Sequence, residues 1–389
     1  MPSPYTDVHD AFRAEVRRFV ETELAPHVDE WERDHLFPKW VFKRAGEVGV
    51  FGAHYPESMG GGGGDFWMTI AKSEELPRAE AAGIAMALLV QSDMATPCIA
   101  DLGSKEQIEE FLTPAIRGEK VAALGVTEPN AGSDVAALRT VARRDGGDYV
   151  VSGSKTFITN GTQCDFITLM VKTDPEAGHQ GLSVLLLPTN LPGVAVSRTI
   201  PKLGNHCSDT AELFFDEVRI PRRYLLGEEG MGFVYLMQSF QSERLVGSAA
   251  GLAASRLTLE KTVRYAQGRH AFGRPLSKRD YWRQKLAELY TDYEAGHALT
   301  YNAASHYNEE KYVLGQPLSL ETTRLTSMAK AFVGEAVFRI VDQCLQLHGG
   351  MGYAEELGIA RAWRDQRLLR IGAGTTEVMR YAIAKIMGF

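Results

Sequence analysis

The sequence predicts an α+β protein in which an N-terminal helical domain, a middle antiparallel β-domain and a C-terminal helical bundle follow one another. Apolar residues recur at helical spacing in the first third, form short β-rich runs between turns in the middle, and return to helical spacing in longer runs thereafter. The length of 389 residues suits two or three domains at roughly 150 residues each. We therefore expect domains at residues 1–121, 122–228 and 229–389.

Helical spacing marks the first of these domains. Apolar residues recur at this spacing between Val8 and Glu32, and again in the segments 39–48, 66–76 and 104–116. The glycine run Gly60–Gly64 follows no predicted strand and precedes no GK[ST] sequence. We interpret this run as a flexible loop rather than as a phosphate-binding site.

Short β-rich runs mark the middle domain. The sequence Asp145-Gly146-Gly147-Asp148 is typical of a β-hairpin turn. The gaps between the runs are too short for crossover helices, so we expect antiparallel pairing in a sheet or barrel. The runs are Tyr149–Val151, Phe166–Val171, Leu182–Leu187, Val194–Val196 and Glu212–Ile220.

Long helical patterns mark the C-terminal domain. They cover Phe233–Gln267, Tyr281–Glu309 and Ser319–His348, and each is longer than an average globular helix. The last pattern stops at Gly349-Gly350, which is typical of a helix C-terminus. Long helices joined by short loops predict an antiparallel bundle, closed by shorter helices towards the C-terminus.

Composition argues against several classes of function. A net charge of −7 and an isoelectric point near 5.9 provide no basic surface for nucleic acid. The four cysteines form no CxxC pair, so we expect no disulfide framework. His206 and His348 each lack a second ligand at zinc-like spacing, so we expect no metal site.

The sequence also predicts a soluble protein. It contains no long uncharged apolar stretch of the kind that spans a membrane, and its N-terminus lacks the pattern of a secretory signal. We expect the protein to be cytoplasmic, or to lie in the mitochondrial matrix if the chain is a mature eukaryotic form.

Two polar segments carry the first sign of function. The segment Val126–Asp134 combines permissive glycine backbone with hydroxyl side chains and could wrap a polar ligand. The segment Ser154–Gly161 places a hydroxyl and an aromatic ring at the end of a predicted strand. Taken singly, each segment is more often a capped turn.

Together the two segments resemble the signature segments of acyl-CoA dehydrogenases, where they line the flavin. The resemblance implies the family fold with a C-terminal four-helix bundle, and assembly as a homotetramer or homodimer with FAD at subunit contacts. Further matches follow in the same order over nearly the whole chain: Lys202-Leu203-Gly204, Ser208-Asp209-Thr210, Asp216–Pro221, Arg269–Gly273, Gln346–Tyr353 and Gly374-Thr375.

The resemblance also implies which residues bind FAD. Thr127 and Ser133 would meet the flavin and its diphosphate, and Phe157 and Thr159 would lie beside the reactive ring. The others are Arg269 and Phe272, which would reach the FAD of a neighbouring subunit, Gln346, Gly349 and Gly350 at its adenine end, and Thr375 and Glu377 near the diphosphate.

The reaction that this resemblance implies needs a carboxylate. A base takes the proton α to the thioester carbonyl of an acyl-CoA while the β-hydrogen leaves as hydride to the flavin, which gives the trans-2-enoyl-CoA. Electron-transferring flavoprotein would then accept the electrons. Many family members carry the base just before the Gly-Thr pair near the C-terminus, where this chain has Ala373.

A second branch of the family, which includes isovaleryl-CoA and long-chain acyl-CoA dehydrogenases, supplies the base from the first long helix of the C-terminal domain. Phe240–Leu245 matches that branch, so we predict Glu243 as the base. Composition alone would favour a solvated helix carboxylate paired with Arg244. The missing acid at Ala373 reverses that preference.

The resemblance assigns substrate contacts to Ser133, Arg244, Ala373 and Gly374. Arg244 would fix local geometry or charge, although it could equally be a surface cation. The chain departs from the family in the stretch 277–284, where Arg279, Asp280 and Arg283 replace aromatic and glutamine residues, so FAD contacts there stay open.

The sequence also bears on other classes of function. An esterase is excluded because the chain contains no GxSxG nucleophile motif. A flavin-dependent oxidase or monooxygenase on the same scaffold, and a non-catalytic FAD-binding subunit, stay open. The acyl chain is not specified by the sequence, and the resemblance favours a medium-chain, long-chain or branched substrate.

Overall fold

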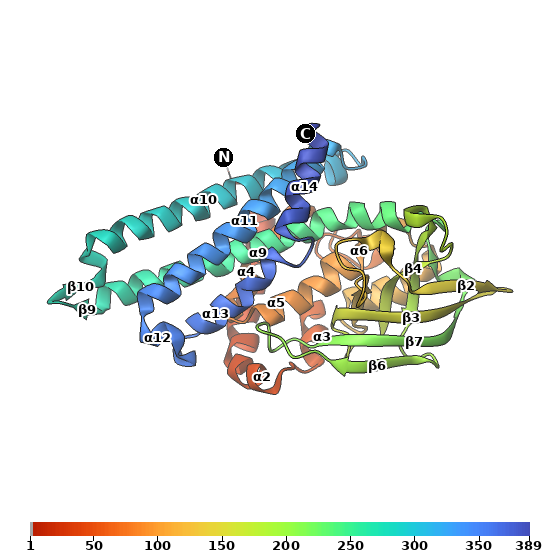
Figure 1. Cartoon of the computed structure of the whole chain (residues 1–389), viewed down its shortest axis with the longest axis horizontal. Coiled ribbons are helices and arrows are strands. Elements are labelled where there is room, and N and C mark those ends of the chain that lie inside the picture. The colour runs from red at the N-terminus through yellow and green to blue at the C-terminus, as the bar shows by residue number, and fades with distance from the viewer. Residues whose placement is uncertain (1–2) are drawn as a thin grey trace.

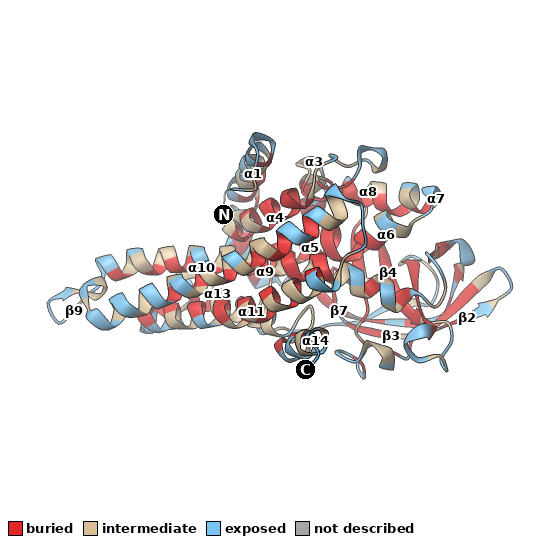
Figure 2. Cartoon of the chain, turned by 90° about the horizontal axis from the view of Figure 1, so that it is seen from above, coloured by how far each residue is buried: buried red, intermediate tan, exposed pale blue. Residues whose placement is uncertain are grey.

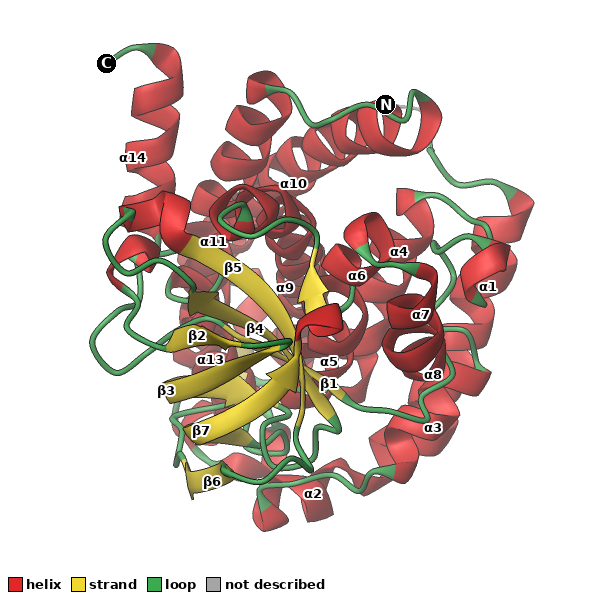
Figure 3. Ribbon diagram, turned by 90° about the vertical axis from the view of Figure 1, so that its right-hand side faces the viewer, coloured by secondary structure: helices red, strands yellow, loops and turns green. Residues whose placement is uncertain are grey.

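The computed structural model describes residues 3–389, and its elements follow the predicted order of helices, strands and helices (Figure 1). The sheet lies at one end of the molecule, and the long C-terminal helices extend away from it. The N-terminal helices lie along one side of the sheet, as the end-on view shows (Figure 3). Buried residues concentrate where the helices meet the sheet, and the far ends of the long helices are more exposed (Figure 2).

Short helices build the N-terminal domain, as its apolar spacing predicts. Several are joined by π-helical or 3₁₀ turns, labelled η. The elements are α1 (Asp7–Phe19), η1 (Val20–Leu24), η2 (Ala25–His27), α2 (Val28–Asp34), α3 (Trp40–Glu47), η3 (Glu57–Met59), α4 (Phe66–Glu75), η4 (Leu76–Ala79), α5 (Ala82–Leu89), η5 (Val90–Ala95), α6 (Pro97–Leu102), α7 (Lys105–Gln107), η6 (Ile108–Leu112) and α8 (Thr113–Ile116).

Two local features shape the chain at the start of α4. The Asp65 carboxylate accepts a hydrogen bond from the Trp67 amide at 2.9 Å and so caps the first turn of α4. The glycine run before it packs against neighbouring backbone, because a Cβ at Gly61 would stand 2.2 Å from the Tyr55 carbonyl oxygen. The run is a loop, as predicted, but Gly61 packs closely against neighbouring backbone, so the prediction of a flexible loop is wrong at this position.

The segment Ala82–Leu102 is long and apolar enough to cross a membrane by length and composition. However, 89% of its most apolar window is buried within the fold. The segment is therefore part of the protein core, because a helix that is apolar on all sides is typical of a buried core helix.

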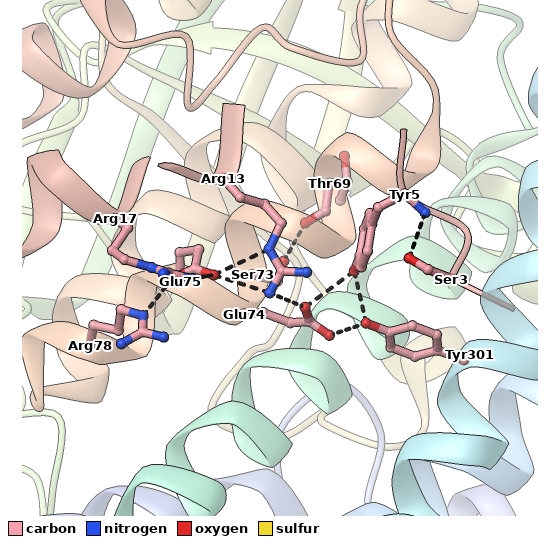
Figure 4. A network of polar contacts seen from close by, with 10 residues as sticks. All are labelled: Ser3, Tyr5, Arg13, Arg17, Thr69, Ser73, Glu74, Glu75, Arg78 and Tyr301. Atoms are coloured by element: carbon pink, nitrogen blue, oxygen red, sulfur yellow. Dashed lines mark hydrogen bonds and ion pairs between the residues drawn. The ribbon is translucent and has the colours of Figure 1, made fainter. Parts of the chain in front are cut away.

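A polar network ties the N-terminus to the rest of the helical core (Figure 4). Arg13 and Arg17 of α1 both donate to the buried Glu75 carboxylate, with nitrogen to oxygen distances of 3.1 and 2.9 Å. The Tyr301 hydroxyl, from a C-terminal helix, donates to Glu74 at 2.5 Å and lies 2.8 Å from the Tyr5 hydroxyl. These contacts fix α1 and α4 against the C-terminal domain.

The middle domain contains the predicted β-sheet. Its strand order is β6-β7-β3-β2-β4-β5-β8, and β1 pairs with β4. The 145–148 turn joins β2 to β3 as the hairpin that the sequence predicts. The strands are β1 (Ala122–Gly125), β2 (Val141–Asp145), β3 (Asp148–Thr159), β4 (Phe166–Lys172), β5 (Leu182–Pro188), β6 (Val194–Thr199), β7 (Thr210–Pro221) and β8 (Leu225–Leu226).

The sheet is mostly antiparallel, and the prediction of wholly antiparallel pairing is wrong for two strand pairs. β1 and β2 both run parallel to β4. A parallel neighbour needs a connection long enough to bring the chain back to the same edge. Here the intervening strand β3 supplies that connection in place of a crossover helix.

Long helices form the C-terminal domain. α9, α10 and α11 pack together around a core that includes Leu259, Tyr293 and Ile340. α14 packs against α11 and completes the bundle (Figure 1). The elements are α9 (Gly232–Gly268), the hairpin β9 (His270–Ala271) and β10 (Arg274–Pro275), α10 (Asp280–Asn308), η11 (Glu309–Val313), α11 (Leu320–His348), α12 (Gly350–Tyr353), α13 (Ile359–Gln366), η13 (Arg367–Arg370) and α14 (Thr376–Met387).

One buried carboxylate joins all three parts of the chain. Asp365, near the end of α13, accepts the backbone amide of Asn205 at 2.6 Å and that of Ala82 at 3.0 Å. Ala82 begins α5 of the N-terminal domain, and Asn205 lies in the loop before β7 of the sheet. Burial raises the pKa of the Asp365 carboxyl to about 6, against the stabilising effect of these amides.

Candidate active site

A buried ion pair holds the two predicted flavin segments together. Lys155, in β3, is fully buried, and its Nζ lies 2.8 Å from Glu128 Oε1 and donates to the Val126 carbonyl at 3.0 Å. Glu128 also accepts the amides of Arg139 at 2.6 Å and Thr140 at 2.9 Å. The turn that carries the first segment is therefore fixed on the strand that carries the second. The structural roles of Lys155 and Glu128 were not predicted from the sequence.

The side chains next to this ion pair are turned outwards. The Thr156 amide donates to the Thr127 carbonyl at 2.8 Å, which places the Thr127 and Phe157 segments side by side. Phe157 is 65% exposed and has a φ of 58°, an uncommon conformation for a bulky residue. Thr127 and Thr159 are half-buried, and Ser133 is exposed. An exposed ring beside several hydroxyls fits a planar, polar cofactor such as FAD.

Glu243 lies in the interior of α9. Its Oε2 atom is buried and has no hydrogen-bond partner among the described residues. Burial raises the pKa of the carboxyl to about 7, although the charges of Arg244 and Lys330 oppose that rise. A buried carboxylate oxygen without a partner is rare in folded proteins, and such groups mark functional sites.

The loop before α14 lies against Arg244. The Arg244 Nε points to the Ala373 carbonyl at 3.4 Å, and a Cβ added at Gly374 would come within 3.9 Å of its Nη2. Both loop residues have positive φ, 57° and 87°. The structure thus brings Arg244, which follows Glu243 in the chain, together with Ala373 and Gly374. The roles of these residues and of Ser133 as substrate contacts stay a prediction.

Arg244 is not the surface cation that its sequence context allowed. The side chain is buried, and its guanidinium carbon stands 5.8 Å from the centre of the Phe240 ring. Burial lowers its pKa, and the Glu243 charge raises it. Arg244 is therefore a buried cation close enough to Glu243 for their charges to influence each other.

Lys330 of α11 completes this cluster. Its place in the site was not predicted from the sequence. The side chain is 1% exposed, and its ammonium donates to the Gly374 carbonyl. Burial and the nearby Arg244 lower its pKa to about 8, while Glu243 and Glu377 oppose that change. The available signal was a lysine between Ala329 and Ala331 in an otherwise apolar stretch of helix.

The segment α5–η5 connects the cluster with the sheet. The Asn160 side chain, just after β3, donates to the Ala87 carbonyl at 3.1 Å. The Ser242 hydroxyl, next to Glu243, points to the Asp93 carbonyl at 3.4 Å. The predicted flavin segments and Glu243 therefore lie on either side of one helical segment.

Five of the predicted FAD residues form a separate group at the far end of the bundle. At about 1.5 Å per residue, Arg269 lies roughly 39 Å from Glu243 along α9. Phe272 is 96% exposed at the tip of the β9–β10 hairpin. Gln346, Gly349 and Gly350 end α11 nearby, since Tyr265 of α9 stacks on His348 with ring centres 4.3 Å apart.

Thr375 and Glu377 lie at the start of α14, and Arg279 lies beside Phe272. Thr375 caps α14 by accepting the Val378 amide at 3.2 Å, and Glu377 is exposed on its first turn. In the divergent stretch, Arg279 donates to the Phe272 carbonyl at 3.2 Å and lies over the Phe272 ring at 5.3 Å. Arg279 therefore closes the hairpin that carries Phe272.

Sequence comparison covers nearly the whole chain. The family descriptions of the acyl-CoA dehydrogenase N-terminal, middle and C-terminal domains match residues 6–119, 123–218 and 230–388. The mitochondrial long-chain specific acyl-CoA dehydrogenase of Mus musculus is 37% identical over 383 residues, which covers 98% of this chain and 86% of the relative. The mitochondrial short-chain specific enzyme of Rattus norvegicus is 34% identical over 378 residues, with 97% and 89% covered.

Solved structures give the same result. An acyl-CoA dehydrogenase from Geobacillus kaustophilus matches with a TM-score of 0.93 and 37% identity over 100% of both chains. A glutaryl-CoA dehydrogenase from Mycobacterium smegmatis, described in complex with FADH2, matches with a TM-score of 0.90 and 29% identity over 98% of this chain and 95% of the other. On this evidence, the protein is an oxidoreductase that belongs to the acyl-CoA dehydrogenase family.

Proposed function

We propose that this protein oxidises an acyl-CoA thioester to the trans-2-enoyl-CoA, with Glu243 as the base that takes the α-proton. The observation that carries the proposal is the buried Glu243 oxygen without a partner. It lies beside a loop that has Ala373 where many relatives have their acid. A pKa near 7 suits a base that works at neutral pH, because such a carboxylate is both ionised and basic enough to accept a proton.

The surrounding residues support this role for Glu243. The Glu243 Oε2 atom is buried and has no partner among the described residues, so the substrate α-carbon would supply the partner that this oxygen lacks. Arg244 fixes the position of the loop at Ala373 and keeps the local charge balanced. Ser133, Ala373 and Gly374 would contact the thioester end of the substrate.

FAD is the cofactor that we propose. Thr127, Ser133, Phe157 and Thr159 would hold its flavin and diphosphate, and FAD supplies, when bound, the acceptor for the β-hydride. Thr375 and Glu377 would lie near the diphosphate.

The second group of predicted FAD residues supports assembly from several copies. Arg269, Phe272, Gln346 and Gly350 lie too far from Glu243 to bind the same FAD within one chain. We therefore propose a homotetramer, or a homodimer, in which these residues reach the FAD of a neighbouring subunit. Electron-transferring flavoprotein is the acceptor that the family resemblance implies, and the substrate we propose is a medium-chain, long-chain or branched acyl-CoA.

The test of this function is anaerobic reduction of the purified holoenzyme by a panel of acyl-CoAs, followed at the flavin absorbance band. We expect one or more acyl-CoAs to bleach the flavin in the wild type. Glu243→Gln should bind FAD and acyl-CoA but lose most of the reduction. Glu260→Gln, on the exposed face of the same helix, is the matched control and should be reduced normally.

Three results would contradict the proposal. Full reduction of Glu243→Gln would remove Glu243 as the base. Rapid reoxidation of the reduced enzyme by oxygen while product is bound would favour the oxidase reading. A colourless protein that cannot be reconstituted with FAD would favour a non-catalytic subunit.

A further inference from the structure

Lys330 is the residue in the cluster whose role the proposed function leaves open. It projects from α11 with 1% of its surface exposed. The ammonium donates to the Gly374 carbonyl, and Gly374 belongs to the loop that lies against Arg244. An isolated buried ammonium is costly, so a lysine kept in this place needs compensating partners.

The charged groups around Lys330 come from three helices. Glu243 and Arg244 face it from α9, and Glu377 faces it from the first turn of α14. Within α5–η5, the nearby Asp93 carboxylate is engaged by Lys72, whose Nζ lies 2.9 Å away. The cluster thus holds two cations, Lys330 and Arg244, and two carboxylates, Glu243 and Glu377, and Lys330 is bonded to the loop through the Gly374 carbonyl.

We propose that Lys330 is a positioning residue for Glu243: it holds the 372–375 loop in place through the Gly374 carbonyl, and its positive charge favours the carboxylate form of Glu243 over the protonated acid before substrate binds. The inference rests on the proposed function, because it requires Glu243 to be the base. Without Lys330, Arg244 would be the single nearby cation for a carboxylate whose Oε2 atom is buried. Removing the second cation should therefore favour the protonated, inactive form of Glu243.

Three substitutions separate the two parts of this role. Lys330→Arg keeps both the charge and a hydrogen-bond donor, Lys330→Gln keeps a donor without charge, and Lys330→Met keeps neither. Lys385→Met, at an exposed position of α14, removes one positive charge outside the site and serves as the control. If Lys330→Met does not fold, Lys330→Gln still tests the charge.

The measurement is the pH profile of kcat/KM for each FAD-loaded enzyme, with ferrocenium as electron acceptor, because this profile reports groups of the free enzyme. We expect the acid limb to move to higher pH by about one unit in Lys330→Gln and Lys330→Met. Lys330→Arg and Lys385→Met should keep the wild-type limb. A purely structural lysine would change amplitude or stability without moving the limb.

The possible outcomes distinguish this inference from the proposed function. If Glu243→Gln keeps full flavin reduction, the proposed base is wrong and the inference falls with it. If Glu243→Gln loses reduction but the acid limb stays unmoved in Lys330→Gln, the base stands and the role of Lys330 is overturned. If the acid limb of kcat/KM moves equally in Lys330→Arg, the role of Lys330 is also overturned, because the loss of charge would not be the cause.

Discussion

Lys155 and Glu128 form an ion pair with both side chains buried, and this pair fixes the first flavin segment on β3. Lys155→Met should lower the free energy of unfolding by about 3–5 kcal/mol, because it leaves a buried carboxylate without its cation. Urea denaturation measures this loss, and FAD content should fall with it. In the double variant with Glu128→Gln the loss should be smaller than the sum of the two single losses, whereas additive losses would show that the pair does not interact.

The pH dependence of catalysis should follow Glu243. Its pKa near 7 means that the active, ionised form increases from about a tenth at pH 6 to about nine tenths at pH 8. We expect kcat/KM to rise by roughly tenfold over this range. A profile that is already flat at pH 6 would show that the free base ionises well below neutral pH.

Glu243 should also make the protein less stable at neutral and alkaline pH. Its pKa is raised from 4.5 in the unfolded chain to about 7 in the fold, so the folded state binds the proton more tightly. Stability is therefore highest below pH 4.5 for this group and falls as the pH rises through 7. Glu243→Gln should be more stable than the wild type by up to about 3 kcal/mol at pH 8.

The same variant should show little gain at pH 5, where the wild-type carboxyl is mostly protonated. Urea denaturation at the two pH values, with Glu260→Gln alongside, measures the difference. An equal gain at both pH values would point to repacking rather than to ionisation.

Phe272 should contribute to assembly and FAD binding but not to the stability of a single chain. The ring is 96% exposed, so Phe272→Ala removes almost no contact within the chain apart from Arg279. We expect loss of bound FAD in the visible spectrum and weaker self-association in sedimentation. Val313→Ala, at a position 61% exposed on η11, is the control and should change neither. Unchanged FAD content in Phe272→Ala would contradict the proposed contact.

The long helices were the most predictable part of the fold. The predicted pattern Phe233–Gln267 corresponds to α9 at Gly232–Gly268, because a sustained apolar period leaves few alternatives. The sheet was harder. β1 has only the residues Ala122–Gly125, none of them β-branched or aromatic, and β2 carries Arg143 and Arg144, so neither has the sequence pattern of a strand. Their pairing is set by contacts with β4, which a local pattern does not contain.

The residues of the candidate site also differ in how far the sequence predicts them. Glu243 could be named from one motif and from the absence of an acid at Ala373. Lys330 could not, because its burial depends on Gly374, which lies far along the chain and reaches it only after folding. The same holds for Lys155, whose partner Glu128 approaches it through the turn that they stabilise together.

The Asp365 carboxylate, held by amides of Ala82 and Asn205, has a mechanical consequence. Separating any two of the three domains would leave this buried acid or a backbone amide without a partner, which is unfavourable. The two hydrogen bonds therefore oppose separation of the domains, and we expect the three domains to respond to a bound ligand as one packed unit.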